Sequence, residues 1–385
     1  MKKKTSKKKM SSKHSCRSRL GGGRPIEPLQ LPGNELLVDM VDNVFACSGF
    51  NGRRLAEACQ LFSRMIDSDA TIALTVAGAM TPIGMSGPII ELMKRGFVDF
   101  IISTGANLYH DLHRPFDFPM EQGNFGANDD ELAQKKIARI YDVYIHDDKT
   151  LTSTDNVILQ TMNGIPANEP ITTSDLHYRI GNVVKKLAPH PEKSLLVNAA
   201  EYDVPIYTSS PGDSSIAMNL AIGHALDRPI FIDPCQDILE STALVRAAKK
   251  NGVVELGGGS PKNFYMQTQP MLWQILRDPS NYTGGHDFFI QLTTDSPQWG
   301  GLSGATPSEA KSWGKLKPED INHVVVYSCS SISFPILCQY VLNKNKARKP
   351  KRLFKQRKEL VETMLDVCKK NPDSLKVWKK YLKQK

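Results

Sequence analysis

One lysine at the end of a glycine-rich segment could act as an amine nucleophile. The segment reads Gly300-Gly-Leu-Ser-Gly-Ala-Thr-Pro-Ser-Glu-Ala-Lys-Ser-Trp-Gly-Lys315. A lysine attacks carbon only as a neutral amine, which requires a pKa lowered by desolvation or by a neighbouring cation. Trp313 offers an apolar wall two residues away, and Lys311 offers a cation one helical turn back. The alternative is that Lys315 is a surface lysine at a helix end, as most lysines are.

Three glycine-containing turns could bind a dinucleotide. They are Gly78-Ala-Met-Thr-Pro82, Thr104-Gly-Ala106 and Gly257-Gly-Gly-Ser-Pro-Lys262. Small residues let backbone N–H groups approach a pyrophosphate closely, and a following helix adds its positive N-terminus. None of the turns has the spaced Gly-x-Gly-x-x-Gly pattern, so each one taken singly is explained by a tight turn alone.

The elements that must position these residues alternate between strands and helices. Two helices are predicted from apolar residues at 36–41 and 55–65, followed by strands at 71–76 and 98–102 around a helix at 89–95. Further strands are predicted at residues 194–197, 205–208, 229–232, 253–256, 288–292 and 324–327, and helices at 215–225, 236–250 and 307–313. This alternation predicts one α/β domain with a mostly parallel sheet, which binds ligands at the carboxyl ends of its strands.

The two ends of the chain differ in charge from its body. Residues 1–24 carry +10 and residues 344–385 carry +12, so residues 25–343 carry −13 of the total of +9. An acidic body attracts cations such as polyamines, whereas nucleic acid fits only the basic ends. Residues 1–31 are predicted to be a disordered basic tail, and residues 344–385 a basic helical extension broken near Pro372. Both ends are interpreted as solvated tails rather than nucleic-acid-binding arms.

Cysteine usage and hydropathy indicate the compartment. The seven cysteines are odd in number and form no Cys-x-x-Cys pair, which favours reduced thiols over disulfides or a zinc site. His110 and His113 have metal-like spacing, but no third ligand follows, so we expect a satisfied or exposed pair and no metal. No apolar stretch is long enough to cross a bilayer, and the basic N-terminus lacks the core of a secretory signal. The sequence therefore predicts a cytoplasmic protein.

The segment that ends at Lys315 resembles a signature of deoxyhypusine synthases. Glu309-Ala-Lys-Ser-Trp-Gly-Lys315 is similar to the family's Glu-Ala-x-Ser-Trp-Gly-Lys motif, in which the final lysine forms a covalent imine. The resemblance covers residues 34–343 and omits both basic ends. Other family landmarks follow in the same order, namely Gly78-Ala-Met80, Ser103-Thr-Gly-Ala-Asn-Leu-Tyr-His-Asp111, Asp213-Ser-Ser-Ile216, Gly257-Gly-Gly259, Thr293-Thr-Asp295 and Leu302-Ser-Gly-Ala305.

The resemblance implies a single Rossmann-like NAD-binding domain over residues 32–343 and a homotetramer with active sites at dimer interfaces. It implies that spermidine is oxidised by NAD, that the butyl fragment is held on a lysine as an imine, and that an acceptor amine then receives it. Lys315 would be the nucleophile. The residues that would bind the amine substrate are Glu309, Trp313, Asn263, His110 and Gly300. The residues that would contact NAD are Gly78, Ala79, Met80, Thr104, Gly105, Ala106, Asp213, Gly258, Gly259, Thr294 and Asp295.

Several positions depart from the family pattern. Asn263 stands where the eukaryotic enzymes have a histidine that serves as base, and an amide cannot take a proton. Met218 and Leu302 replace acidic residues that grip spermidine, and His110 replaces an acidic residue in the second turn. Cys329 stands where the family has an aspartate near the cofactor. The NAD frame and the imine lysine are thus retained, whereas the polyamine-binding positions are altered.

Three functions fit these observations. The first is NAD-dependent transfer of an aminobutyl group to a protein lysine, which would make deoxyhypusine on the hypusine-bearing translation factor. The second transfers the same group to a free diamine such as putrescine and gives homospermidine. The third is a non-catalytic NAD-binding scaffold whose basic ends dock on RNA.

Overall fold

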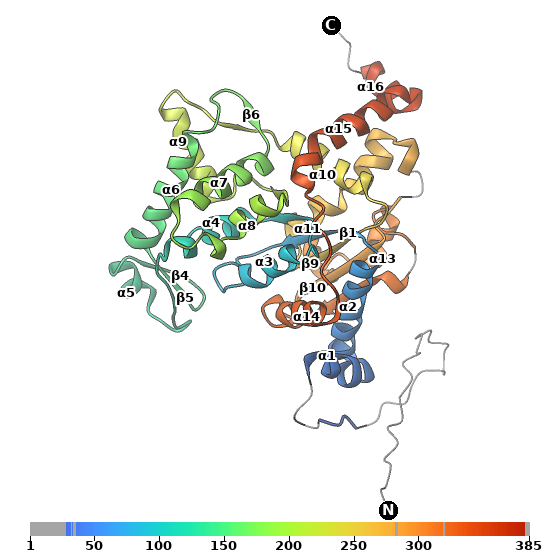
Figure 1. Cartoon of the computed structure of the whole chain (residues 1–385), viewed down its shortest axis with the longest axis horizontal. Helices are drawn as coiled ribbons and strands as arrows, with labels where there is room; N and C mark the ends of the chain where they lie inside the picture. The colour runs from blue at the N-terminus through green and yellow to red at the C-terminus, as the bar shows by residue number, and fades with distance from the viewer. Residues whose placement is uncertain (1–27, 32, 34–35, 282–283, 319, 382–385) are drawn as a thin grey trace, which may run out of the picture.

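Six parallel strands form the centre of the molecule (Figure 1). The computed structural model describes residues 28–31, 33, 36–281, 284–318 and 320–381. The strands are β1 (Thr71–Val76), β2 (Phe100–Ser103), β7 (Ile206–Thr208), β9 (Asn251–Leu256), β10 (Phe288–Thr293) and β11 (His323–Tyr327). Their spatial order, β7-β2-β1-β9-β10-β11, is the 3-2-1-4-5-6 order of dinucleotide-binding folds when this sheet's strands are numbered along the chain. The winding reverses between β1 and β9, which leaves a crevice at their carboxyl ends.

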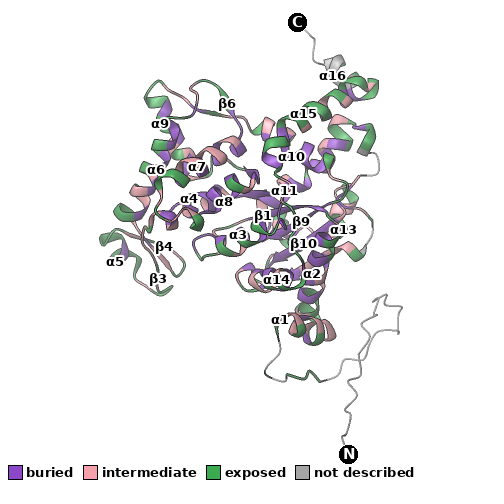
Figure 2. Ribbon diagram, in the orientation of Figure 1, coloured by how far each residue is buried: buried purple, intermediate pink, exposed green. Residues whose placement is uncertain are grey.

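Apolar side chains on both faces of the strands explain why the sheet is central. Every residue of β1, β2, β9 and β10 is buried, as expected for a parallel sheet with helices on both faces (Figure 2). Neighbouring residues of β1 belong to different cores. Ile72 packs in the core that contains α2 (Phe50–Asp67), α3 (Ser86–Lys94) and α14 (Ser330–Lys344). Ala73 packs in the core that contains α10 (Pro234–Ala247), α11 (Gly259–Met266) and α15 (Leu353–Lys370).

A second group of helices continues the molecule beyond the β7 edge of the sheet (Figure 1). An antiparallel sheet of β3 (Met120–Gln122), β4 (Ile137–Ile140) and β5 (Val143–His146) lies at its outer end beside α5 (Asp129–Gln134). The helices of the group are α4 (Gly105–Asp111), α6 (Ser153–Met162), α7 (Thr173–Leu187), α8 (Leu195–Tyr202) and α9 (Ser215–Ala225). No helix among the described residues is long and apolar enough to cross a membrane.

The structure confirms the predicted α/β domain and corrects two predicted strands. Residues 194–197 begin helix α8, because the hydroxyl of Ser194 accepts the N–H of Val197 and the carboxylate of Asp111 accepts the N–H groups of Leu195 and Leu196. A short buried apolar run does not distinguish strand from helix by periodicity. Residues 229–232 contain only β8 (Phe231–Ile232), which pairs with β6 (Pro170–Ile171) outside the central sheet.

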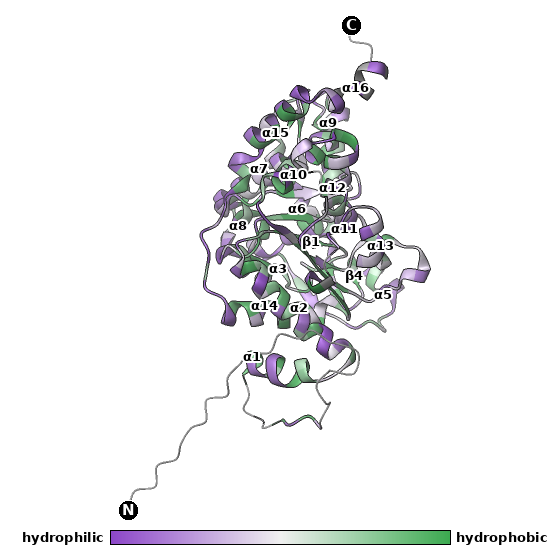
Figure 3. Cartoon of the chain, turned by 90° about the vertical axis from the view of Figure 1, so that its right-hand side faces the viewer, coloured by the Kyte–Doolittle hydropathy of each residue, from purple (hydrophilic) through white to green (hydrophobic). Residues whose placement is uncertain are grey.

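The C-terminal segment packs against the body, so the prediction of a solvated tail is wrong for α15. This helix lies beside α10, and hydrophobic residues recur along it at helical spacing between hydrophilic ones (Figures 1 and 3). Arg357 is 4% exposed and donates to Glu240 (3.1 Å) and to Asp175. Phe354 stacks on Tyr178, with ring centres 3.8 Å apart. The positive charge of this segment is partly used to neutralise carboxylates of the body.

Of the two remaining predictions for the chain ends, the break near Pro372 is confirmed and the disordered N-terminal tail stays a prediction. The predicted break near Pro372 is found, because α15 ends at Lys370 and α16 (Pro372–Tyr381) begins at the proline. The predicted disordered tail over residues 1–31 lies, except for residues 28–31, outside the described residues.

Candidate active site

Lys315 lies in the loop between α13 (Pro307–Ser312) and β11, and its backbone is fixed on both sides. Gly314 takes the left-handed conformation, with φ +62°, that commonly follows the end of a helix. The N–H of Lys315 donates to the carbonyl of Ala310 (3.0 Å), and its carbonyl accepts the N–H of His286 (2.9 Å). The lysine is therefore held in place before any ligand binds.

The amine of Lys315 meets the condition for a nucleophile. Its Nζ donates to Oδ1 of Asn263 at 3.2 Å and lies 5.5 Å from the centre of the Trp313 ring. Burial lowers the pKa of Lys315, and the cation of Lys262 lowers it further, while the carboxylate of Glu309 acts in the opposite direction. The structure thus brings three of the predicted substrate residues, Asn263, Trp313 and Glu309, around the predicted nucleophile.

The cation that lowers the pKa of Lys315 is Lys262, not Lys311 as the spacing suggested. The amine of Lys311 donates to a backbone carbonyl of the following loop at 3.2 Å. Lys262 is 5% exposed on α11, and its amine donates to Oε1 of Gln291 (2.9 Å) and to the carbonyl of Ala305 (2.7 Å). Burial also lowers the pKa of Lys262. Two lysines therefore share one partly desolvated region, and each disfavours the charged form of the other.

A buried carboxyl group faces the amine of Lys262. Oε2 of Glu255, in β9, lies 3.9 Å from Nζ of Lys262, and Glu255 is completely buried. Burial raises the pKa of Glu255 to about 8, and neither of its oxygens has a hydrogen-bond partner. Sequence analysis missed this pair, although a glutamate within the apolar run 253–256 is a visible signal of a buried charge.

The crevice between β1 and β9 contains a cavity of about 360 Å³. Backbone and small residues build it. Gly78 and Gly257 have positive φ (+66° and +74°), and the hydroxyl of Thr104 donates to the carbonyl of Gly78 at 2.8 Å. A Cβ on Gly258 would lie 2.5 Å from Cα of Ser303, so a larger residue does not fit there. The residues that line the cavity include Gly78, Met80, Gly257, Thr293, Thr294, Asp295 and Cys329.

The other predicted cofactor residues lie beside this cavity or in the turns next to it. Ala79 lies between two lining residues, and the N–H of Gly259 donates to the hydroxyl of Ser303 (2.9 Å), which lines the cavity. Gly105 begins α4, followed by Ala106, and it packs against Ser214 beside the exposed Asp213. Asp213 thus belongs to the neighbouring turn and is not among the residues that line the cavity.

This crevice fits a dinucleotide such as NAD. The absent side chain of Gly257, which lines the cavity, lets the backbone approach a pyrophosphate, and Gly258 then forms the N-cap of α11. The carboxylate of Asp295 is the type of group that accepts ribose hydroxyls in dinucleotide-binding folds. Gly78, Gly257 and Gly258 would hold the phosphates, and Asp295 with Thr294 would contact a ribose.

Two predicted substrate residues lie away from Lys315 within the chain. His110, on α4, forms a 2.9 Å contact between its Nδ1 and Nε2 of His113, whose Nδ1 meets the hydroxyl of Thr154 at 2.7 Å. Burial lowers the pKa of His110 to about 4 and that of His113 to about 3, so both rings are neutral near pH 7. Gly300 is exposed and ends the short helix that contains Trp299, a residue that lines the crevice cavity.

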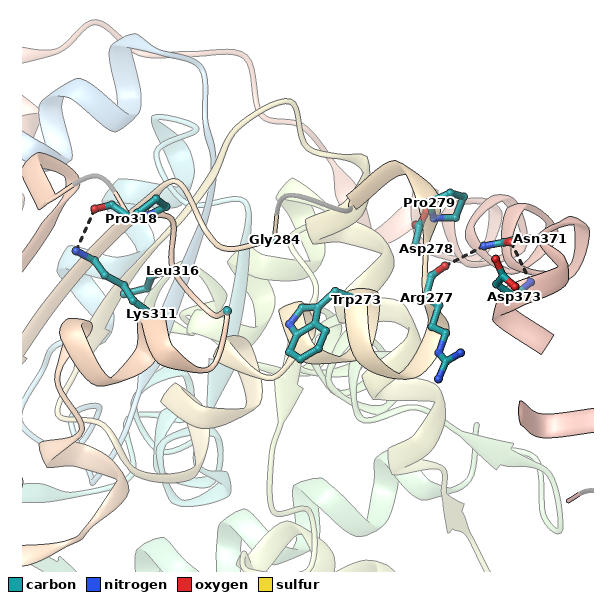
Figure 4. Close-up of a pocket in the computed structure, with 11 residues that line it drawn as sticks. Trp273, Arg277, Asp278, Pro279, Gly284, Lys311, Leu316, Pro318, Asn371 and Asp373 are labelled. Atoms are coloured by element: carbon teal, nitrogen blue, oxygen red, sulfur yellow. Dashed lines mark hydrogen bonds between the residues drawn. The ribbon is translucent and has the colours of Figure 1, made fainter. Parts of the chain in front are cut away.

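Two further cavities flank the segment that carries Lys315. A cavity of about 470 Å³, called here the lysine-side cavity, contacts both Asn263 and Trp313. A larger cavity, of about 940 Å³, lies between Trp273, the loop around Gly314 and the start of α16 (Figure 4). Lys315 is among the lining residues of neither cavity, but Asn263, which accepts from its amine, and Trp313, whose ring lies beside that amine, both line the smaller one. The lysine-side cavity is therefore the candidate substrate site.

Comparison with known proteins confirms the resemblance noted in the sequence. The family model described as Deoxyhypusine synthase matches residues 39–341. A "Deoxyhypusine synthase-like protein" of Nostoc punctiforme is 40% identical over 352 residues, which is 89% of this chain and 89% of that protein. A "Probable deoxyhypusine synthase 2" of Methanosarcina acetivorans is 34% identical over 314 residues, which is 81% of this chain and 88% of that protein.

The fold also has a counterpart among solved structures. The crystal structure of a "putative deoxyhypusine synthase" from Entamoeba histolytica has a TM-score of 0.57 at 15% sequence identity, and covers 84% of this chain and 99% of that one. At this identity the likeness concerns the fold alone. Because the family model matches most of the chain, including Lys315 and all six strands of the central sheet, the chain belongs to the deoxyhypusine synthase family.

Proposed function

We propose that the protein is an NAD-dependent transferase that moves an aminoalkyl group from a secondary amine of the polyamine class to an acceptor amine. The observation that carries this proposal is the amine of Lys315, which is half-buried, oriented by Asn263 and given a lowered pKa by burial and Lys262. NAD, when bound in the crevice, supplies an acceptor for the donor's hydride and returns it to the product.

Lys315 carries the transferred group in this reaction. Once the donor is an imine, the neutral amine attacks its carbon, and the donor's other half leaves as an amine that takes the two hydrogens lost by the lysine nitrogen. The carbon remains bound to Lys315 through a new C=N bond. An acceptor amine then attacks the same carbon and releases the lysine. Asn263 orients Nζ by accepting one of its N–H groups and takes no proton itself.

The residues around Lys315 would serve the substrate rather than the cofactor. Trp313, 60% exposed, offers a face to the alkyl chain, and Glu309 offers one carboxylate to an ammonium group. The net charge of −13 over residues 25–343 favours the approach of amines from solution.

We also propose that the protein is a cytoplasmic homotetramer with active sites at dimer interfaces, as the family resemblance implies. Helix α9, which starts beside Asp213, supports the assembly because it leaves apolar side chains uncovered. Met218, Ile222 and Leu226 are 69%, 49% and 71% exposed. Apolar side chains clustered in this way are typical of subunit interfaces.

The acceptor distinguishes the two forms of the proposed reaction. Transfer to a lysine of the hypusine-bearing translation factor would make deoxyhypusine, and transfer to putrescine would make homospermidine. Transfer to a protein lysine is the first form of the proposal. The altered positions Met218, Leu302 and Asn263 make transfer to a free diamine a serious alternative, because they replace groups that the family uses on spermidine. Incubation with NAD, a polyamine donor and both acceptors in competition would separate them by product mass. If neither acceptor gained mass, transfer itself would be wrong.

A further inference from the structure

The lysine-side cavity is lined entirely by uncharged side chains among the residues that the structure describes. Its apolar walls are formed by Phe264, Met271, Ile275 and Leu302. Its polar groups are neutral, namely hydroxyls and amides, the latter including those of Gln267 and Gln274. Its volume of about 470 Å³ is within the range of small-molecule sites. The cavity is therefore suited to hold the arm of a ligand whose reactive carbon is at Lys315.

The charged residues on the helices around this cavity are engaged elsewhere. On α10, Asp237 accepts the N–H and hydroxyl of Thr173, and Glu240 accepts from Arg357. On α11, Lys262 donates to Gln291 and Ala305. No carboxylate is thus among the described residues that line the cavity, because Glu309 lies outside this lining, and the nearby cation of Lys262 would repel an ammonium group inside it.

The chemistry of the lining selects between possible donors. A buried ammonium ion without a counter-charge is strongly disfavoured, whereas amides and hydroxyls lose little when neutral partners replace water. Spermidine carries a free ammonium at the end of its aminobutyl arm, which is the arm that the proposed function leaves on the lysine. The amides of Gln267 and Gln274 instead match a neutral polar end, such as an acyl amide.

We propose that the group taken up by Lys315 ends in a neutral function, of the N-acyl type, rather than in a free ammonium. This inference rests on the proposed function and specifies its donor. With spermidine acetylated on its aminobutyl nitrogen, the arm carbon beside the secondary amine gives a hydride to NAD and the nitrogen loses a proton. Lys315 then replaces 1,3-diaminopropane at that carbon, and the departing nitrogen of the diaminopropane takes the two hydrogens that the lysine nitrogen loses.

Two acetylated isomers provide a matched test. The full chain with NAD is given spermidine, spermidine acetylated on the aminobutyl nitrogen, or spermidine acetylated on the aminopropyl nitrogen, followed by borohydride and mass mapping of the peptide that contains Lys315. The two isomers have the same charge and composition, and only the first has a neutral aminobutyl arm. We expect the first to label Lys315 at least tenfold faster than the other two donors.

The outcomes separate the inference from the function on which it rests. Equal or faster labelling by spermidine or by the aminopropyl-acetylated isomer would overturn the inference and leave the proposed transfer standing. Absence of an adduct from all three donors would overturn the proposed function, and the inference with it.

A substitution in the cavity wall sharpens the same test. Leu302 is 49% exposed and lines the cavity, so Leu302→Asp adds a carboxylate without emptying the core. The measured quantity is the ratio of Lys315 labelling rates, aminobutyl-acetylated spermidine over spermidine. We expect Leu302→Asp to lower this ratio at least tenfold. The control Ile321→Asp, at a surface residue that is 70% exposed, should leave the ratio unchanged. Comparing donors within one variant cancels any loss of folded protein. An unchanged ratio in Leu302→Asp would mean that the arm does not enter this cavity.

Discussion

The crevice between β1 and β9 and the lysine-side cavity lie on two sides of the same short segments but are built differently. Gly257 and Ser303 line the crevice, whereas Asn263 and Leu302, a few residues away or adjacent, line the cavity. Glycines and short side chains form much of the crevice, and beside it a Cβ added to Gly258 would collide with Ser303. Exchangeable side chains form the cavity. A fold can therefore keep most of its cofactor site while its substrate site changes. The departures Asn263 and Leu302 line the cavity, whereas Cys329 is a departure that lines the crevice.

Removal of the lysine amine should have the largest effect and should affect only one of the two regions. Lys315→Ala is expected to reduce transfer by more than about a thousandfold, because it removes the covalent nucleophile. Lys315→Arg should fail as well, since a guanidinium stays protonated. Calorimetric titration should find NAD binding nearly unchanged in both variants. Retention of most of the turnover by either variant would contradict the role of Lys315.

Enlarging the crevice backbone should damage the other region. In Gly258→Ala the new Cβ would lie 2.5 Å from Cα of Ser303, and overpacking of this kind costs about 1–3 kcal/mol. We expect NAD affinity to fall by about tenfold to a hundredfold. Gly87→Ala is the control, because a Cβ there meets nothing within 4 Å and the position is helical. Equal NAD affinity in the two variants would mean that the crevice does not hold the dinucleotide.

A smaller effect should appear as a change in pH dependence. Imine formation needs neutral Lys315, so its rate rises with pH through the pKa of this lysine. The cation of Lys262 lowers that pKa, and its removal should move the rising limb to higher pH. We would measure the pH profile in the double variant Lys262→Met with Glu255→Leu, which removes this cation without leaving an unpaired buried carboxylate.

The lysine on the other side of the loop provides the control for this pH profile. Lys311→Met should leave the profile in place, because the amine of Lys311 donates to the carbonyl of Pro318 and the pKa of Lys315 is set by burial, Lys262 and Glu309. If the Lys262 variant kept the original profile, or the Lys311 variant moved it, the assignment of the tuning cation would be wrong.

The sequence predicts the sheet well because its strands are continuous apolar runs. Residues 71–76 and 288–292 are strands in the structure, since fully buried parallel strands need no polar alternation. The same argument misassigns residues 194–197. A helix begins there because Ser194 caps it and because the carboxylate of Asp111, 83 residues away in sequence from Ser194, bonds to its first turn. A contact that distant cannot be read from local periodicity.

The site is predictable only where its residues share one segment. The motif around Lys315 gives Trp313 and Glu309 directly, and the family pattern adds Asn263. Lys262 and Glu255 become a pair only when α11 packs on the central sheet, so local spacing assigns the cation that tunes Lys315 to Lys311, which is nearer in sequence. The C-terminal charge was likewise misread as solvated, because the partners of Arg357 lie on α7 and α10, more than a hundred residues earlier.

The most direct test of the account is to locate the carbon–nitrogen bond that it requires. The full-length protein is incubated with donor and NAD, reduced with borohydride, digested and mapped by mass, with parallel samples that lack NAD. The account predicts a donor-derived adduct on Lys315 that depends on NAD and is absent from Lys262 and Lys311. An adduct on another lysine, or none on Lys315 with any amine donor, would contradict it.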